Sequence, residues 1–443
     1  MTKKIFSLLV FILTCVCASA QDGAHGAYSP YSIYGIGDLS QQGTAFNKGM
    51  GGVGIATRNN RYINYMNPAA VTARDSLAFM ADFGLAQKNT LYAQNYQRSA
   101  NMLAERHSAN NTFNIYDFIM TFPLWKSSAF MVGITPFSDV GYDFARIEKE
   151  QNIIGNTGNI EYNSYGNGSV YQIFFGAGAT FWKSLSVGAE AIYYFGNIDK
   201  ITNMNYSDAS YRSINSGSQL SIRGVTGKFG VQYEQKIAGD VSVIVGGTYR
   251  LGTDMKGYAV NYQYATQSSV SDSLKYKVDT LGMEKLRIGD ELGIGLAVKC
   301  GDKWSAEVNY TRSDWSNSGF NTAPGFSVRG GMDFASTVSH SYRAGFEFTP
   351  NRNDIRYYLK RCTYRGGVYY DKEYYTVNGN NVNKMGITLG VTLPVFKLYN
   401  GLTLGVDFGQ RASKKYNMIR ERYVMFNIGF NIHDKWFQKL QYN

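Results

Sequence analysis

One pattern repeats along most of this chain and restricts the folds open to it. Between residues 75 and 432, segments of ten to twelve residues carry apolar side chains at alternate positions, and polar turns or loops separate them. In residues 185–195, for example, the odd positions are all apolar, whereas Ser186, Gly188 and Glu190 lie between them. Because successive side chains of a β-strand point to opposite faces, this alternation predicts strands with one apolar and one polar face.

Three features favour a transmembrane barrel over a soluble β-sandwich, whose strands also alternate. Aromatic residues such as Trp304 and Tyr310 begin or end many apolar faces, as in the interfacial girdles of outer-membrane barrels. The opposite faces carry glycine, small polar residues and isolated charges. Connections alternate between short ones, such as 183–184 and 301–303, and long ones, such as 253–289. We therefore predict an all-β fold, a transmembrane antiparallel up-and-down β-barrel, with a soluble all-β fold as the weaker alternative.

We predict about fourteen strands, an even number that places both ends of the barrel on the periplasmic side. Two of the connections expected to be long are 199–219 and 314–336. The predicted strands are 75–86, 112–123, 128–144, 168–181, 185–198, 222–236, 241–252, 289–300, 304–313, 338–350, 361–371, 384–395, 400–412 and 421–432.

The first twenty residues predict export. Lys3 and Lys4 precede an apolar run, and Ala18-Ser19-Ala20 follows it, which is the order of a secretory signal peptide cleaved after Ala20. A membrane anchor is the weaker interpretation, because the apolar run is shorter than the roughly 20 residues that a spanning helix needs. We therefore expect an integral protein of the outer membrane, in contact with its lipid and lipopolysaccharide. The predicted parts are a signal peptide (1–20), a hatch (21–74), a barrel (75–432) and a periplasmic tail (433–443).

Residues 28–66 are too rich in glycine for a helix or a long strand, yet they differ from a flexible linker. They carry tyrosines, Phe46 and Met50, which are large side chains that need a surface to pack against. We predict that this segment is a hatch that fills the lumen of the barrel.

Several motifs resemble one family of outer-membrane proteins. They are Gly49-Met50-Gly51-Gly52-Val53-Gly54, then Asn67-Pro68-Ala69 just before the first strand, and Ser76-Leu77-Ala78-Phe79 in that strand. Together they resemble the hatch and first strand of the FadL/TodX family, transporters of long-chain fatty acids and aromatic hydrocarbons. The resemblance implies fourteen strands, a hatch in the lumen, capture of a hydrophobic ligand at the extracellular loops, and lateral release at a kink in the third strand. Pro136 and Gly141 lie in the predicted third strand, although a bulge without a transport role is the simpler interpretation.

A hydrophobic small molecule or lipid is therefore the expected ligand, placed between the hatch and the barrel wall. We expect lumen cations to meet its carboxylate, and we select Arg250, Lys228 and Arg343. Its tail would lie on Phe46, Met50 and neighbouring hatch and loop side chains. Gly51, Gly52, Gly54, Asn67, Pro68 and Ala69 form the expected hatch motif.

The alternative function is that of an accessory or carrier barrel subunit of an outer-membrane secretion or assembly complex. Trp436 and Phe437 in the predicted tail suit either a membrane anchor or a docking peptide for a protein partner. The net charge is +11, but the basic residues are scattered, so we expect no nucleic-acid partner. The four histidines fit no nucleophile motif and no metal spacing, so we predict no enzyme, no metal and no cofactor.

Overall fold

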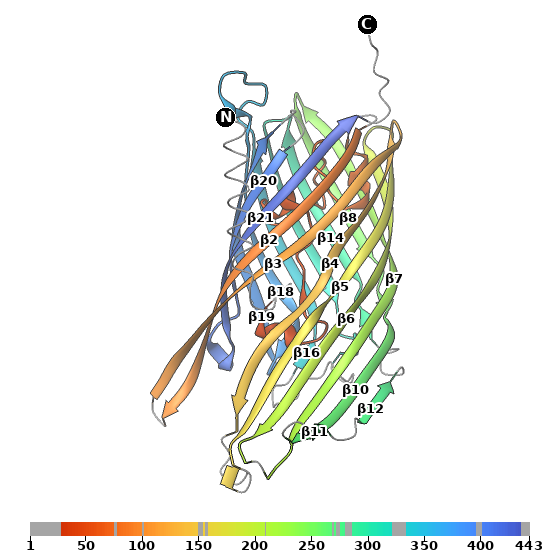
Figure 1. Cartoon of the computed structure of the whole chain (residues 1–443). Helices are drawn as coiled ribbons and strands as arrows, with labels where there is room; N and C mark the ends of the chain where they lie inside the picture. The colour runs from red at the N-terminus through yellow and green to blue at the C-terminus, as the bar shows by residue number, and fades with distance from the viewer. Residues whose placement is uncertain are drawn as a thin grey trace.

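The computed structural model describes the chain in ranges, which are 28–74, 78–99, 102–148, 154–155, 158–208, 210–267, 270–271, 275–279, 286–320, 334–395 and 401–435. The predicted signal peptide and Trp436 and Phe437 lie outside them. Fourteen long antiparallel strands form the wall of a barrel (Figure 1), as the sequence predicts. They are β2 (Ala78–Ser99), β3 (Met102–Trp125), β4 (Ser128–Ile147), β5 (Ile160–Phe181), β6 (Leu185–Tyr206), β7 (Ser213–Ala238), β8 (Val241–Arg250), β14 (Glu291–Cys300), β15 (Trp304–Asp314), β17 (Val338–Phe348), β18 (Thr363–Val377), β19 (Asn380–Pro394), β20 (Gly401–Arg411) and β21 (Arg420–Lys435).

The barrel closes where the last strand pairs with the first. The β2–β21 register runs from Ala78 opposite Lys435 to Ala93 opposite Arg420. β21 therefore ends three residues later than predicted, because its last residues still find antiparallel partners on β2.

Shorter elements belong to the hatch and to the connections. They are η1 (Pro30–Ile33), β1 (Asp38–Leu39), α2 (Ala45–Lys48), η2 (Pro68–Thr72), β9 (Thr253–Asp254), β10 (Lys256–Gln267), β11 (Val270–Ser271), β12 (Lys275–Asp279), β13 (Arg287–Ile288), β16 (Phe334–Ser336), α4 (Tyr358–Arg361) and η3 (Lys415–Asn417). No helix among the described residues is long and apolar enough to cross a membrane.

Several predicted loops are wrong because strands run on beyond the expected membrane span. Much of 199–219 belongs to β6 and β7, and β18 and β19 meet at a tight turn at Asn378 and Gly379. These segments are polar and lack the apolar alternation of a membrane strand. They still form strands, because outside the hydrocarbon both faces of a hairpin can be polar while the backbone remains paired.

The two faces of the wall are those of a membrane barrel. Ser186 and Gln232 are fully buried in the lumen, whereas the adjacent Val187 and Val231 are 39% and 43% exposed on the outer surface. Apolar side chains thus face outward and polar ones inward, the reverse of a soluble sandwich. Cys300 and Cys362 are both free.

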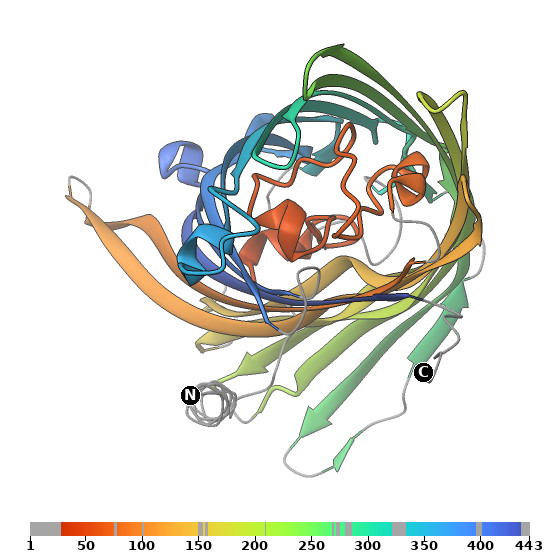
Figure 2. The same cartoon turned by 90° about the horizontal axis from the view of Figure 1, so that it is seen from above.

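Residues 28–74 lie inside the barrel, as the red segment in Figure 2 shows along the barrel axis. Most of their side chains are buried, including Phe46, Met50 and Tyr65. The apolar core of the protein therefore sits between this segment and the inner face of the wall.

Candidate functional site

The barrel wall has a gap between β3 and β4. These strands pair only at one end, from Phe118 opposite Ile134 to Trp125 opposite Ser128. Beyond Ile134, β4 continues against β5, and β3 continues against β2 as part of an arm that leaves the barrel (Figure 1). Beyond this place β3 and β4 are therefore no longer paired with each other.

Two irregularities explain why the strands separate there. The β2–β3 register skips Tyr116, and the β4–β5 register skips Phe137, directly after Pro136. An extra residue bends its strand, and proline removes a backbone donor from the ladder. Both bulges lie just beyond the last β3–β4 pair, so β3 and β4 turn away from each other at the same level.

The hatch fills the β4 side of this gap. Asp38 and Leu39 of β1 pair with Asp139 and Ser138 of β4, so the hatch contributes a short antiparallel strand. On either side of this pair, Ser40 N donates to Phe137 O at 2.9 Å and Ser29 N donates to Gly141 O at 2.7 Å. The edge of β4 that β3 leaves is thus satisfied by residues 29–40.

Gly141 has further contacts with this segment. Its N–H donates to Ser32 Oγ at 3.0 Å, and Tyr28 donates its hydroxyl to Asp143 O at 2.7 Å. Tyr92 on β2 donates to Tyr28 O at 2.6 Å and so links the hatch to the strand next to β3, the other rim of the gap. Pro136 and Gly141, the residues expected to form the kink, therefore lie at the start of the gap and within it.

A buried charge cluster fixes the same part of the hatch to the wall. Arg411 of β20 contacts Asp38 at 2.7 Å, Glu373 at 3.3 Å and Glu421 at 3.4 Å. Ser29 donates its hydroxyl to Glu421 and receives a hydrogen bond from Arg411. This cluster was missed from the sequence, because its members come from distant segments that only barrel closure brings together.

The three cations expected to bind a carboxylate already face carboxylates of the wall. Arg250 contacts Glu291 at 3.2 Å, and Lys228 lies opposite Glu190 in the β6–β7 register. Arg250 also donates to the Tyr194 hydroxyl at 3.0 Å.

Arg343 also contacts a carboxylate of the wall. It contacts Asp371 at 2.8 Å and donates to Gly51 O of the hatch at 3.2 Å. Arg343 therefore holds the hatch in place, and a ligand carboxylate at either arginine would have to compete with a protein carboxylate.

The glycine-rich hatch motif lies against the wall at close range. Gly51 N donates to Thr388 Oγ1 at 2.7 Å, and both Gly51 and Gly52 have positive φ, +73° and +77°. Phe46 stacks on Tyr62 with ring centroids 5.0 Å apart.

Met50 and Gly54, which belong to the same glycine-rich segment, are also closely packed. Met50 O would lie 2.2 Å from a Cβ on Gly345, and a Cβ on Gly54 would lie 2.7 Å from Asn47 Nδ2. Phe46 and Met50 are thus buried side chains that pack between the hatch and the wall.

Asn67, Pro68 and Ala69 form the second hatch contact. Asn67 Oδ1 accepts from Ala69 N at 3.0 Å and caps η2, while Nδ2 donates to Ile55 O at 2.8 Å and to Val231 O at 3.2 Å. Glycines on the wall make room for this turn, because a Cβ on Gly230 would lie 2.0 Å from Asn67 Oδ1.

Apolar side chains connect the outer loops with the gap. Met255, Leu286, Trp315 and Phe320 from the loops belong to one buried cluster. The same cluster includes Tyr31 of the hatch and residues of β4 and the adjoining wall, which are Phe137, Val140, Tyr142 and Tyr194. Buried apolar side chains of the long loops, the hatch and the β4 edge thus pack together as one apolar layer of the lumen.

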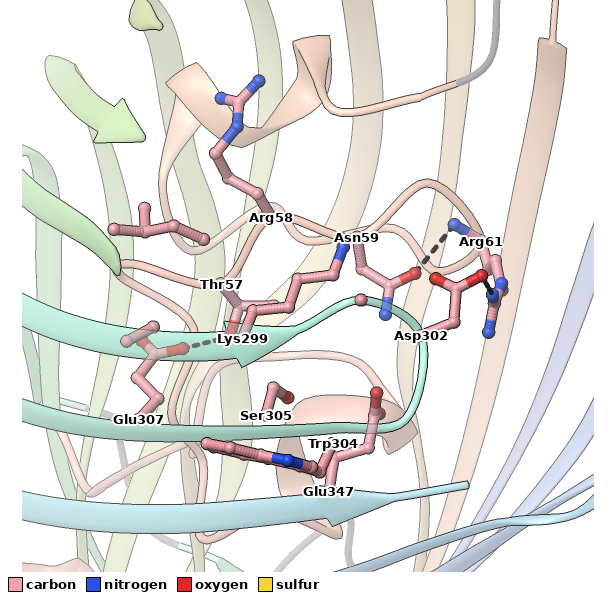
Figure 3. A pocket seen from close by; sticks show the side chains of 13 residues that line it. Thr57, Arg58, Asn59, Arg61, Lys299, Asp302, Trp304, Ser305, Glu307 and Glu347 are labelled. Carbon is pink, nitrogen blue, oxygen red and sulfur yellow. Dashed lines mark hydrogen bonds and ion pairs between the residues drawn. The ribbon is translucent and has the colours of Figure 1, made fainter. Parts of the chain in front are cut away.

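A cavity near the short-turn end of the barrel is small and charged (Figure 3). Its volume is about 20 Å³, which is room for about one water molecule. Arg61 contacts Asp302 at 2.7 Å at its rim, and Glu307 accepts hydrogen bonds from Thr57 and from Ala56 N. These contacts attach the hatch to the wall and leave no space for a lipophile here. Within the described ranges, no group of three or more His, Cys, Asp and Glu could hold a metal ion.

Comparison with known proteins gives one family and several structures. A family model described as BamG matches residues 1–443. The toluene transporter TbuX of Ralstonia pickettii is 14% identical, with a TM-score of 0.57 over 88% of this chain and 98% of that one. The P. putida toluene transporter TodX is 13% identical, with a TM-score of 0.56 over 91% and 100%. A Pseudomonas aeruginosa FadL homologue is 10% identical, with a TM-score of 0.55 over 90% and 99%. No curated protein sequence matches.

At these identities the solved structures share the fold of this chain, a barrel of the FadL type. The predicted resemblance to the FadL/TodX family is therefore supported at the level of fold, while the family model that spans the chain is a different one.

Proposed function

This chain belongs to the BamG family, and on that premise we propose that it is an outer-membrane barrel whose working part is the hatch-lined gap between β3 and β4. A hydrophobic small molecule, such as a long-chain fatty acid, is captured at the extracellular loops. It then passes along the apolar layer of the lumen and leaves sideways into the lipid beside Pro136 and Gly141.

This proposal depends on one observation, which is that residues at the gap belong to the same buried apolar cluster as residues of the loops. Phe137 and Val140 of β4 belong to the same buried cluster as Trp315 and Phe320 of the outer loops. A lipophile on this route stays in apolar surroundings, so it avoids the cost of entering water. Lateral exit also needs an interruption of the wall, and the β3–β4 pairing ends at Phe118 and Ile134.

Passage requires that the hatch leave the edge of β4. The contacts to break are the β1–β4 pair, the hydrogen bonds that Ser29 and Ser40 donate, and the buried contact of Asp38 with Arg411. Each hydrogen bond contributes about 0.5–1.5 kcal/mol net, and breaking a buried ion pair costs about 3–5 kcal/mol, so release of this segment costs more than its hydrogen bonds alone. Local openings of this kind occur on timescales from microseconds to seconds.

A reversible tether tests this mechanism. Leu39 and Ser138 lie directly opposite each other, at a separation typical of antiparallel partners that a disulfide can span. We expect oxidised Leu39→Cys/Ser138→Cys to take up neither labelled oleate nor labelled toluene, and a reductant to restore uptake. The matched control is Ser128→Cys/Ala179→Cys, which links β4 to its permanent neighbour β5. Equal uptake by the oxidised and reduced hatch tether would refute lateral exit at this place.

The second candidate function is that of an accessory or carrier barrel in a secretion or assembly complex. It is favoured by the lumen itself, where Arg250 and Arg343 face wall carboxylates and hatch side chains such as Met50 pack against the wall. A barrel that works by docking needs no path through its lumen. Native mass spectrometry of the protein purified from its membrane distinguishes the two, since a bound lipophile supports transport and a bound protein supports the complex.

The predicted tail offers a further comparison. Because β21 runs to Lys435, the chain should be cut after Lys435 rather than after His433, so that the closing strand pair stays whole. A transporter should keep uptake after this cut, whereas a subunit that docks through Trp436 and Phe437 should lose its partner.

A further inference from the structure

One rim of the gap has no strand partner. From Met102 to Asp117, one edge of β3 pairs with β2, and no strand in the described part of the chain pairs with the other edge. The facing rim differs, because residues 29–40 of the hatch cover β4. Among the residues that the structure describes, sixteen residues of β3 thus present a row of backbone donors and acceptors with no strand beside it.

The open edge begins at the level of the hydrocarbon. Phe113, Ile115 and Phe118 are 42%, 51% and 43% exposed on the outer surface, which marks this part of β3 as facing lipid. Beyond them the exposed side chains become polar, as at Glu105, His107 and Asn111. A backbone group without a partner costs several kcal/mol in hydrocarbon, and open sheet edges do not occur there facing lipid. Something must cover this edge in the membrane.

Ion pairs join the arm to the barrel, and the middle of the arm carries little protection against pairing. Glu105 contacts Lys414 at 2.9 Å and Arg420 at 3.5 Å, so the arm is tied to the β20–β21 connection. Edge strands that avoid pairing carry proline, lysine or other charges, or a bulge. Residues 104–116 contain no proline or lysine, and Glu105, Arg106 and the bulge at Tyr116 lie near the two ends of this stretch. Residues 107–115 between them are therefore open to pairing.

We propose that this edge of β3 is a docking surface for an extended strand of another outer-membrane polypeptide, which adds antiparallel to β3 where β4 departs. Only a polypeptide backbone supplies donors and acceptors that alternate at the spacing of a strand, whereas an acyl chain supplies none. The partner strand carries apolar side chains beside Phe113 and Ile115 and small polar ones beside Ser108 and Asn110.

A second copy of this chain fits less well than a different protein. Two copies inserted in one membrane share one orientation, so their β3 strands would have to pair in parallel. Every strand pair in the described barrel is antiparallel, and parallel pairing is slightly less stable per residue. The proposal does not rest on transport, and it supplies a surface for the accessory function named above.

Site-specific photo-crosslinking in native outer membranes tests the proposal. A photoreactive amino acid replaces Asn111, Phe113 or Ile115, whose side chains share the exposed face of β3. The matched control is Phe229 on β7, which is 51% exposed but lies on a strand paired with both neighbours. Heat-modifiable migration of each variant verifies that the barrel folds.

We expect all three β3 positions, and not Phe229, to form adducts with one protein. The crosslinked residues of that protein should lie two apart in a single segment and run in the order opposite to β3. Adducts with lipid or lipopolysaccharide alone, adducts between two copies of this chain, scattered sites, or equal labelling from Phe229 would each overturn the proposal. Labelled oleate uptake is measured on the same variants, so that failure of docking and failure of transport are seen separately.

Discussion

At the scale of single residues, the packing of the hatch depends on glycines, which have no side chain. Gly51 and Gly52 have positive φ, and a Cβ on them would lie 2.7 Å from Ala344 O and 2.3 Å from Arg343 Nη1. Conformation and space both require glycine here. The motif identified from the sequence thus has a physical cause, the close approach of the hatch turn to β17.

We expect Gly51→Ala to loosen the hatch and leave the barrel folded. Alanine at positive φ costs roughly 1–2 kcal/mol, and its Cβ meets the backbone of β17. The measurement is ion conductance in planar bilayers, which should rise. Gly239→Ala is the control, since Gly239 also has positive φ, +53°, but has no atom within 4 Å of its Cβ and lies in a turn of the wall. Equal conductance of both variants would contradict a role of Gly51 in closure.

A second residue-scale prediction concerns Arg411. Removing one partner of a buried ion pair leaves the other charge buried without a partner, which costs about 3–5 kcal/mol of folding stability. Arg411→Gln leaves Asp38, Glu373 and Glu421 without their shared cation. We expect the temperature of the heat-modifiable transition to fall clearly. Adding Glu421→Gln should recover part of the loss, and a double mutant no more stable than Arg411→Gln would argue against coupling.

At the scale of elements, the sequence predicts the membrane spans well and their extensions poorly. All fourteen strands were found because apolar alternation is imposed by lipid on one face. The arm of β2 and β3 was expected to be a loop, since residues 87–111 lie largely outside that constraint. Pro136 indicated the irregularity on β4, but Tyr116 carries no comparable signal. The gap arises from both bulges together, so one sequence position could not reveal it.

The turn after β17 gives a pH prediction at this scale. Asp354 accepts from Tyr357 N at 2.6 Å and from Arg356 N at 2.9 Å, and these backbone hydrogen bonds lower the pKa of its carboxyl. A lowered pKa stabilises the turn at pH values above the ordinary carboxyl range, and this contribution is lost as pH falls through the lowered pKa. We expect the Tyr357 amide to lose exchange protection upon acidification. Asp354→Asn should flatten that dependence, and an unchanged profile would contradict the assignment.

At the scale of the whole molecule, the hatch and the inner face of the wall are complementary in both hydrogen bonding and shape. Glu307 of β15 accepts from the hatch backbone at Ala56, Arg343 donates to Gly51 O, and wall glycines receive the turn at Asn67. The inner face could be predicted to be polar, but the partners of its polar groups could not, because each contact joins residues that lie far apart in the chain.

Deleting residues 28–66 should therefore open the lumen without dismantling the barrel. The wall strands keep their ladders, and the wall groups that lose hatch partners, such as Glu307 and Arg343, become hydrated by the water that enters. We expect heat-modifiable migration to persist and conductance to rise well above that of the intact protein. The control removes a segment outside the lumen, with Ala93–His107 replaced by Asn-Gly, since Tyr92 and Ser108 are paired neighbours. That variant should conduct like the intact protein. Conductance unchanged by the hatch deletion would show that residues 28–66 do not close the barrel.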